Sequence, residues 1–284
     1  MFKEPTILKE LDKYDFLSKI ITSFQDYDNL YLVTDYFEGD ILYNYRNDIM
    51  SEEEIKFIAA CLIQSLIYLR NKKIINRDIR MKNLIMDNNR YLNLIDFSFA
   101  IKYSEKDNLK NNIIGNKNET APEILNHSKY DYNSDYYRIG TIIYYLIFKK
   151  YVNYEKEEKK INEIIINYND ITNYSSNCIE FLNKLIVTNY KERIGFRSIN
   201  ELKNHNWFNG CDWKNFEKKK MNSSLKFMKK KFNRTYCKNF VITEENKIMY
   251  RRIEKSKIYK KLNKNYDYVN KLIVDNILNL FKNN

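Results

Sequence analysis

The spacing of apolar residues predicts a short helix and then a β hairpin at the start of the chain. Residues 4–13 repeat apolar side chains with the period of one helix face. The apolar members of this face are Ile7, Leu8 and Leu11. Two strand-like runs follow at 17–24 and 30–37, and turn-forming residues at 26–29 separate them. We therefore expect the two runs to pair with each other.

A long helix is predicted to begin at Ser51. The pattern Ser51-x-x-Glu54 is a capping box, in which two side chains satisfy free N–H groups of the first helical turn. The apolar residues that follow form one helical stripe: Ile55, Ile58, Ala59, Leu62, Leu66 and Leu69. After Lys73 the pattern changes to short β-like pieces, which are 74–75, 84–86 and 92–95. From Pro122 onward the chain is predicted to be mostly helical.

The composition favours a folded intracellular protein. Hydrophobic residues make up 44% of the 284 residues and aromatic residues 15%, which excludes a wholly disordered chain. The longest apolar run, 141–148, is too short to span a membrane, and the charged first residues do not resemble a signal peptide. The cysteines form no metal-binding pattern: Cys61, Cys178, Cys211 and Cys237. We expect reduced thiols and a cytoplasmic or nuclear location.

Basic residues are concentrated near the C-terminus. Lys and Arg number 29 against 30 Asp and Glu up to Phe208, and 20 against 7 after it, so the tail carries essentially the net charge of +12. Hydrophobic residues punctuate its basic runs: Phe216, Leu225, Phe227 and Phe232. This mixture predicts docking on an acidic protein or an anionic membrane surface, whereas packing on the chain's own body is the alternative. No direct nucleic-acid motif is present, and a last amphipathic helix is predicted at 269–281.

Five short motifs follow one another in a fixed order. They are N-R-D-I-R-M-K-N at 76–83, D-F-S at 96–98, A-P-E at 121–123, D-Y-Y-R-I-G at 135–140 and K-E-R-I-G around Arg193. Each alone is a weak signal, but together they resemble the catalytic loop, metal motif, activation-segment end, central helix and late arginine of eukaryotic protein kinases. The resemblance implies the α+β protein kinase fold, with a complete, mainly helical C-lobe and an incomplete N-lobe.

The same resemblance implies transfer of the γ-phosphate of ATP to Ser or Thr of a protein substrate, with Mg²⁺ as cofactor. Asp78 takes the position of the catalytic base, and Arg80 replaces the family's lysine as the contact to the transferring phosphate. Asn83 and Asp96 take the positions of the Mg²⁺ ligands, and their oxygen atoms suit that ion. The alternative interpretation of these polar residues is that they are turn residues in surface loops.

Finer matches indicate the AGC class of Ser/Thr kinases. Residues 30–36, L-Y-L-V-T-D-Y, resemble its strand and hinge, and residues 204–213, N-H-N-W-F-N-G-C-D-W, resemble its exit toward a C-terminal tail. The resemblance covers residues 4–213. It implies nucleotide-binding positions at Thr34, Asp35, Phe37, Asp40 and Ile85.

Structural roles follow from the resemblance for five charged residues. Glu123 and Arg193 take the positions of a buried ion pair that braces the activation segment. Asp135 takes the position that anchors the backbone of the catalytic loop. Arg77 takes that of an arginine that binds a phosphorylated threonine, and Glu4 aligns with the glutamate of the family's αC helix.

The glycine-rich loop and the lysine strand that precede this helix in the family are not found in the sequence. Its glycines are isolated from one another: Gly39, Gly115, Gly140, Gly195 and Gly210. The phosphates lose their backbone cradle and Glu4 lacks its lysine partner, so an ordinary exposed acid is the favoured interpretation of Glu4. We expect an N-terminally truncated kinase domain that binds ATP weakly.

Five further positions depart from the family pattern. Ser98 replaces a glycine of the metal motif, which reduces backbone freedom there. Asn76 brings an amide into an apolar internal stack and needs a hydrogen-bond partner. Asn112 stands about where AGC kinases carry an activating phosphothreonine. Lys82 and Tyr145 replace acids that read basic residues in substrates, so a preference for arginine-rich substrates is not expected.

Two functions from different classes remain open at this point. The first is a Ser/Thr protein kinase, and the alternative is an inactive pseudokinase that acts as an interaction scaffold. A third interpretation is that the sequence begins inside a longer protein that contains the missing strands. The predicted divisions are an N-lobe remnant at 1–37, the C-lobe at 38–208 and a basic tail at 209–284.

Overall fold

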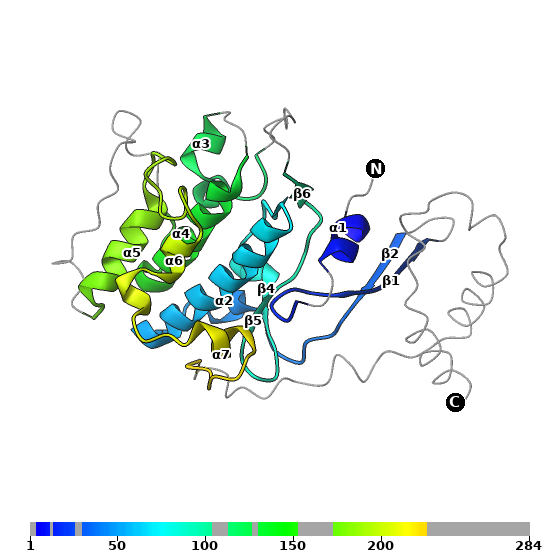
Figure 1. The fold of residues 1–284 in the computed structure, drawn as a ribbon, viewed down its shortest axis with the longest axis horizontal. Helices are drawn as coiled ribbons and strands as arrows, with labels where there is room; N and C mark the ends of the chain where they lie inside the picture. Colours follow the sequence, from blue (N-terminus) through cyan, green and yellow to red (C-terminus); the bar gives the residue numbers. More distant parts are fainter. Residues whose placement is uncertain are drawn as a thin grey trace.

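A small β hairpin lies beside a larger helical part in the computed structural model (Figure 1). The structure describes residues 4–11, 14–25, 30–103, 113–126, 130–152 and 173–225. The predicted helix at 269–281 and the positions Asn112, Phe227 and Phe232 lie outside these ranges.

The predicted N-terminal helix and hairpin are confirmed, although each element is shorter than predicted. They are α1 (Glu4–Glu10), β1 (Ile20–Gln25) and β2 (Leu30–Thr34). The strands are antiparallel, and Phe24 lies opposite Tyr31 with the ring centroids 4.7 Å apart. Aromatic pairs of this kind stabilise a two-stranded ribbon.

The first part of the predicted run 17–24 pairs with the helical part instead of with β2. Leu17 forms a parallel bridge with Leu94, and the Ser18 N–H donates to the Leu94 carbonyl at 3.0 Å. The Leu94 N–H in turn donates to the Phe16 carbonyl at 2.9 Å. These bonds connect the hairpin to the larger part of the molecule.

Helices make up most of the larger part. They are α2 (Glu52–Asn71), α3 (Pro122–Leu125), α4 (Tyr132–Phe148), α5 (Ser176–Ile186), α6 (Asn200–Lys203) and α7 (Trp213–Glu217). The predicted capping box of α2 is present, since Ser51 Oγ accepts from the Glu54 N–H at 3.3 Å and the Glu54 carboxylate accepts from the Ser51 N–H at 2.8 Å. Every residue of the predicted apolar stripe is buried.

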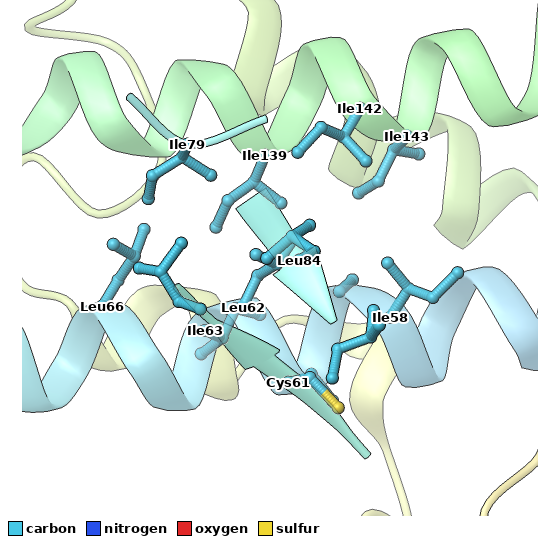
Figure 2. Packing of buried hydrophobic residues seen from close by; sticks show 14 of the residues in the cluster. Ile58, Cys61, Leu62, Ile63, Leu66, Ile79, Leu84, Ile139, Ile142 and Ile143 are labelled. Atoms are coloured by element: carbon cyan, nitrogen blue, oxygen red, sulfur yellow. The ribbon is translucent and has the colours of Figure 1, made fainter. Parts of the chain in front are cut away.

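The buried faces of α2 and α4 form the centre of the core (Figure 2). Isoleucines of α4, such as Ile139 and Ile143, face leucine and isoleucine side chains of α2. Ile79, which comes directly after Asp78, lies in the same cluster. The core therefore holds the predicted catalytic loop against the central helix.

Short strands and single 3-10 turns connect the helices that form this core. The strands are β3 (Ile74–Ile75), β4 (Leu84–Met86), β5 (Leu92–Leu94) and β6 (Ile101–Lys102), which pair as β3–β6 and β4–β5. The 3-10 turns are η1 (Leu42–Tyr45), η2 (Met81–Asn83), η3 (Lys117–Glu119) and η6 (Asn206–Phe208). The predicted β pieces are thus confirmed. Two of the five motifs lie in the connections between these strands.

Residues 213–225 pack against the core. Phe216 is buried, and its ring lies 5.3 Å from that of Tyr91 and 5.1 Å from that of Phe57. Lys219 is largely buried, and its Nζ donates to Asp87 at 2.5 Å and to Asn93 at 2.8 Å. Leu225 is also buried. Docking of Phe216 and Leu225 on a membrane is therefore wrong, because both already pack on the chain itself.

The described helices include none with the length and apolar character needed to cross a lipid bilayer. The cysteines in the described ranges are free thiols: Cys61, Cys178 and Cys211.

Candidate active site

The catalytic loop is fixed to the first turn of α4 by Asp135. The buried Asp135 carboxylate accepts from the Asn76 N–H at 2.8 Å and from the Arg77 N–H at 3.0 Å. Burial raises the pKa of Asp135 to about 6, although these two hydrogen bonds favour the ionised form. Arg77 adopts a left-handed backbone conformation, with φ at 68°. The loop backbone is therefore bent sharply where it meets the helix.

Asn76 joins this loop to the D-F-S motif. Its side chain is fully buried, yet both ends of the amide have partners. Oδ1 accepts from the Asp78 N–H at 3.0 Å, and Nδ2 donates to the Asp96 carbonyl at 3.2 Å. The hydrogen bonds that the sequence requires of this amide are therefore present.

Asp78 presents a buried carboxylate with cations on both sides. Its Oδ2 accepts from Asn83 Nδ2 at 2.8 Å and lies 3.2 Å from Arg80 Nε. Arg138, on α4, places Nη1 3.9 Å from the other oxygen, Oδ1. Burial raises the pKa of Asp78, while Arg80, Arg138 and the bond from Asn83 act in the opposite direction. The carboxylate can thus serve as a hydrogen-bond acceptor for a substrate group.

Asp96 is held by its own motif. It has φ at 68°, and its Oδ1 accepts from the Ser98 N–H at 3.0 Å and from Ser98 Oγ at 2.6 Å. The sequence predicted only a loss of backbone freedom at Ser98 and missed this bond. The signal for it was the hydroxyl two residues after Asp96, which is the spacing of a local side-chain turn.

The oxygen donors at the site fit Mg²⁺. Asn83 uses its amide nitrogen to hold Asp78, which leaves its amide oxygen as a donor, and Asp96 adds a carboxylate. Among the described residues, no group of three or more His, Cys, Asp and Glu side chains could hold a metal alone. Mg²⁺ commonly binds through one or two protein oxygens together with phosphates and waters, so this small donor set is sufficient.

Glu4 differs from its favoured interpretation as an exposed acid. It is half-buried, and its Oε1 accepts from the Phe97 N–H at 3.1 Å. Burial raises the pKa of Glu4 and the Phe97 hydrogen bond lowers it. Glu4 therefore links α1 to the D-F-S motif, and that link needs no lysine partner.

A cavity of about 280 Å³ lies between the hairpin and the catalytic part. It is lined by Leu8, Ser18, Thr34, Asp35, Tyr36, Phe37, Ile85, Ile95, Asp96 and Phe97. Four predicted nucleotide positions are in this lining, and Asp40 is not. A larger hollow of about 680 Å³, between α5 and α6, contains Arg193 as its single predicted site residue among those described.

The acids of the hinge are already engaged by the protein. The Asp35 carboxylate accepts from Ser18 Oγ at 3.1 Å and from the Lys19 N–H at 2.8 Å. Asp40 Oδ1 accepts from the Ile41 N–H at 2.7 Å. Gly39 lets the hinge approach β4, since an added Cβ would lie 2.0 Å from the Met86 carbonyl oxygen. Backbone groups of the hinge are thus better placed than these side chains to bind a ligand.

The two structural arginines have protein partners. Arg193 is buried and donates to both carboxylate oxygens of Glu123, at 2.6 and 2.9 Å. Arg77 Nε donates to the Phe99 carbonyl at 2.8 Å, and its guanidinium lies 5.3 Å from the Tyr130 ring. Arg77 is therefore held in place by groups of the protein itself.

Two cations share one tyrosine ring beside the catalytic loop. Arg46 lies 4.0 Å and Lys82 lies 4.8 Å from the centroid of Tyr43. Tyr145, which like Lys82 replaces an acid of the family pattern, packs on Tyr151 with the ring centroids 4.7 Å apart. This face of the site is consequently cationic and aromatic.

These features match one family throughout the body of the chain. Residues 1–208 match the family model described as the protein kinase domain, and the chain therefore belongs to the protein kinase family. The predicted family and α+β kinase fold are confirmed.

Similar curated proteins place the chain among Ser/Thr kinases. It is 30% identical over 215 residues to Serine/threonine-protein kinase sgk-1 of Caenorhabditis elegans, covering 74% of this chain and 46% of that protein. It is 27% identical to Sgk1 of Danio rerio over 78% of this chain and 52% of that protein, and 27% identical to AtPK1/AtPK6 of Arabidopsis thaliana over 80% and 49%. The chain thus spans about half the length of these relatives. The matches support the predicted AGC class.

Proposed function

We propose that this chain provides the catalytic C-lobe of an ATP-dependent Ser/Thr protein kinase. The observation that carries the proposal is the buried Asp78 carboxylate, held by Asn83 at 2.8 Å and faced by Arg80 at 3.2 Å. In phosphoryl transfer the substrate hydroxyl oxygen forms a bond to the γ-phosphorus as the bond to the β-phosphate oxygen breaks. Asp78 orients this hydroxyl and accepts its proton.

The neighbouring residues have separate tasks in this proposal. Arg80 contacts the transferring phosphate through a planar fork of donors. Asn83 and Asp96 hold Mg²⁺, which when bound neutralises charge on the phosphates. The hinge at 34–37 bonds the adenine through backbone groups. Because no G-x-G-x-x-G occurs in the 284 residues, we expect this chain to bind Mg-ATP only in the high micromolar range.

We further propose that the kinase does not prefer substrates with basic residues near the phosphorylated Ser or Thr. Arg46 and Lys82 lie on the Tyr43 ring next to the catalytic loop, and like charges repel. An acidic protein substrate such as dephosphorylated casein is therefore expected to accept phosphate faster than histone. The reverse order would contradict this substrate preference and leave the proposed reaction standing.

The direct test is phosphate transfer by the full chain at saturating Mg-ATP. The variant Asp78→Asn keeps the size of the side chain and removes the base, and it is expected to reduce transfer by about 100- to 10,000-fold. Asp15→Asn is the matched control, because Asp15 is exposed and pairs with Lys19 alone among the described contacts. Equal transfer by wild type and Asp78→Asn would contradict the proposal. An absence of transfer from wild type would instead favour a pseudokinase scaffold.

A further inference from the structure

A buried arginine of the central helix reaches both the catalytic loop and the activation segment. Arg138 has 1% of its surface exposed. Its Nη2 donates to the Ile114 carbonyl at 2.7 Å, and its Nη1 lies 3.9 Å from Asp78 Oδ1. Neither Nη1 nor Oδ1 has a hydrogen-bond partner among the described residues. Arg138 Nη1 and Asp78 Oδ1 therefore face each other as oppositely charged, buried atoms, and their mutual attraction is the interaction that each has in place of a hydrogen bond.

The charge of Arg138 is balanced by acids from three elements. They are Asp78 on the catalytic loop, Asp135 on α4 and Glu119 on η3. Burial raises the pKa of each of these acids, and the charge of Arg138 opposes that rise. A buried arginine without such partners would strongly destabilise the fold, because its charge would be uncompensated. The buried charge of Arg138 is therefore compensated only when the catalytic loop and the activation segment both lie against it.

Gly115 allows the segment to touch this pair. Its φ is 81°, a conformation that residues with a Cβ rarely adopt. A Cβ added here would lie 3.3 Å from Asp78 Oδ1 and 3.7 Å from Arg138 Nη1. The chain at Ile114–Gly115 is therefore in contact with the carboxylate and the guanidinium at once.

The residues next to both ends of the contact pack in the core. Ile139, the neighbour of Arg138, and Ile79, the neighbour of Asp78, lie in the same core cluster (Figure 2). The core fixes the distance between the helix and the catalytic loop, so the segment at Ile114 is the remaining part that Arg138 can hold or release.

We propose that Arg138 is a positioning residue that fastens the activation segment, at Ile114–Gly115, to the catalytic loop at Asp78. Its effect on phosphate transfer rests on the proposed function. The geometry requires two separated donors on one planar group, one for the Ile114 carbonyl and one facing Asp78. Lysine can supply one of these, and methionine neither.

The first test measures backbone hydrogen–deuterium exchange in the full chain for Arg138→Met, Arg138→Lys and the control Ile147→Val. Exchange at residues 113–121 is expected to rise about tenfold or more in Arg138→Met, and less in Arg138→Lys. Ile147 lies on the same helix and is only partly buried, and Ile147→Val removes one methylene without changing charge, so exchange at 113–121 should stay at the wild-type rate. Unchanged exchange in a folded Arg138→Met protein would overturn the proposal.

Gly115→Ala provides a second variant if Arg138→Met does not fold. It retains Arg138 and pushes the segment away from it, because the new Cβ meets Asp78 and the left-handed backbone is strained. The same local rise in exchange is expected at 113–121. Exchange at the wild-type rate in this variant would also contradict the proposal that Arg138 fastens the activation segment to the catalytic loop.

The second test measures transfer of phosphate from Mg-ATP to casein. Arg138→Met should lower kcat per folded molecule about 100-fold, since small misplacements of reacting groups cost that much, with KM for ATP within about twofold. Arg138→Lys should restore part of kcat, and Ile147→Val should match wild type. An unchanged kcat in Arg138→Met would reduce Arg138 to a structural residue. If wild type transfers no phosphate but exchange responds as expected, the proposed function fails and the anchor stands.

Discussion

Single residues at the site have local tasks that their motifs do not reveal. Asn76 is fully buried, and its side chain bonds both the Asp78 N–H and the Asp96 carbonyl. Its short amide has one acceptor and one donor end, and it spans two loops that a purely apolar side chain would leave unbonded. The departure from the family pattern is therefore matched by two hydrogen bonds.

Replacing Asn76 with alanine should lower the free energy of unfolding by about 2 to 5 kcal/mol. The variant leaves the buried Asp78 N–H and the partly buried Asp96 carbonyl without partners, and each such loss costs about 1–3 kcal/mol. Urea denaturation measures the change. The control is Asn88→Ala, since Asn88 is exposed on the turn between β4 and β5 and its loss should change the free energy by about 0.5 kcal/mol or less. Equal effects of the two variants would show that the buried bonds of Asn76 add no stability.

The sequence located the polar residues of the catalytic loop but not their partners. A motif describes residues that are close in sequence. Asn83 and Asp78 are five residues apart, and their side chains lie within 2.8 Å of each other, as this short spacing allows. The contacts of Glu4 and Arg138 join residues far apart in the chain, and no local pattern encodes them. An arginine inside the otherwise apolar run of α4 was the available signal for Arg138, because such a charge is buried only with partners.

At the scale of elements, side-chain caps determine where several turns begin. Ser51 caps α2, and His205 caps η6 by accepting the Trp207 N–H at its Nδ1, 3.2 Å away. Burial and the charge of Lys184 lower the pKa of His205, while Glu180 raises it. The cap requires neutral Nδ1, because a protonated imidazole has no acceptor.

The cap at His205 should make stability depend on pH. A histidine with a lowered pKa in the folded state binds protons less readily than in the unfolded state, so its stabilisation is present above the ordinary pKa of 6.5 and is lost as pH falls. His205→Asn keeps a capping acceptor that does not titrate. Between about pH 7.5 and pH 5, wild type should lose stability relative to this variant in urea denaturation. A constant difference across this range would contradict the role of His205.

Periodicity predicted the elements well where one partner covers a whole face. The α2 stripe meets a single core and was predicted over its full length. The run 17–24 was predicted as one strand, but Leu17 pairs with Leu94 and only Ile20 onward pairs with β2. Alternating side chains indicate a strand and do not identify its partner, so this division could not be predicted from the pattern.

For the molecule as a whole, a basic segment completes the core. The sequence offered two interpretations of Phe216, docking outside the chain or packing on it, and its ring packs with those of Phe57 and Tyr91. Charge counting could not decide between them, because the amine of Lys219 is itself held between Asp87 and Asn93. The lysine-rich composition of residues 213–225 therefore gives no sign that this segment packs on the core.

Removing the Phe216 ring should weaken the whole molecule. Phe216→Ala is expected to lower the free energy of unfolding by about 3 to 5 kcal/mol, since it leaves a cavity among aromatic rings. Phe196→Ala is the matched control, because Phe196 is 36% exposed and should cost about 1 kcal/mol or less. Calorimetric melting temperatures of both variants provide the comparison. If the two variants melt together, α7 contributes nothing to the stability of the core.

The attachment of residues 213–225 separates two meanings of a domain end. The match to the protein kinase family model ends at Phe208, whereas the folding unit extends past Phe216. A shortened chain ending at Phe208 would uncover the rings of Phe57 and Tyr91, and we expect it to be recovered from expression mostly as insoluble aggregate. A chain ending at Leu225 keeps these rings covered and should remain in the supernatant. An expression boundary set at the end of the family model would therefore cut through the hydrophobic core.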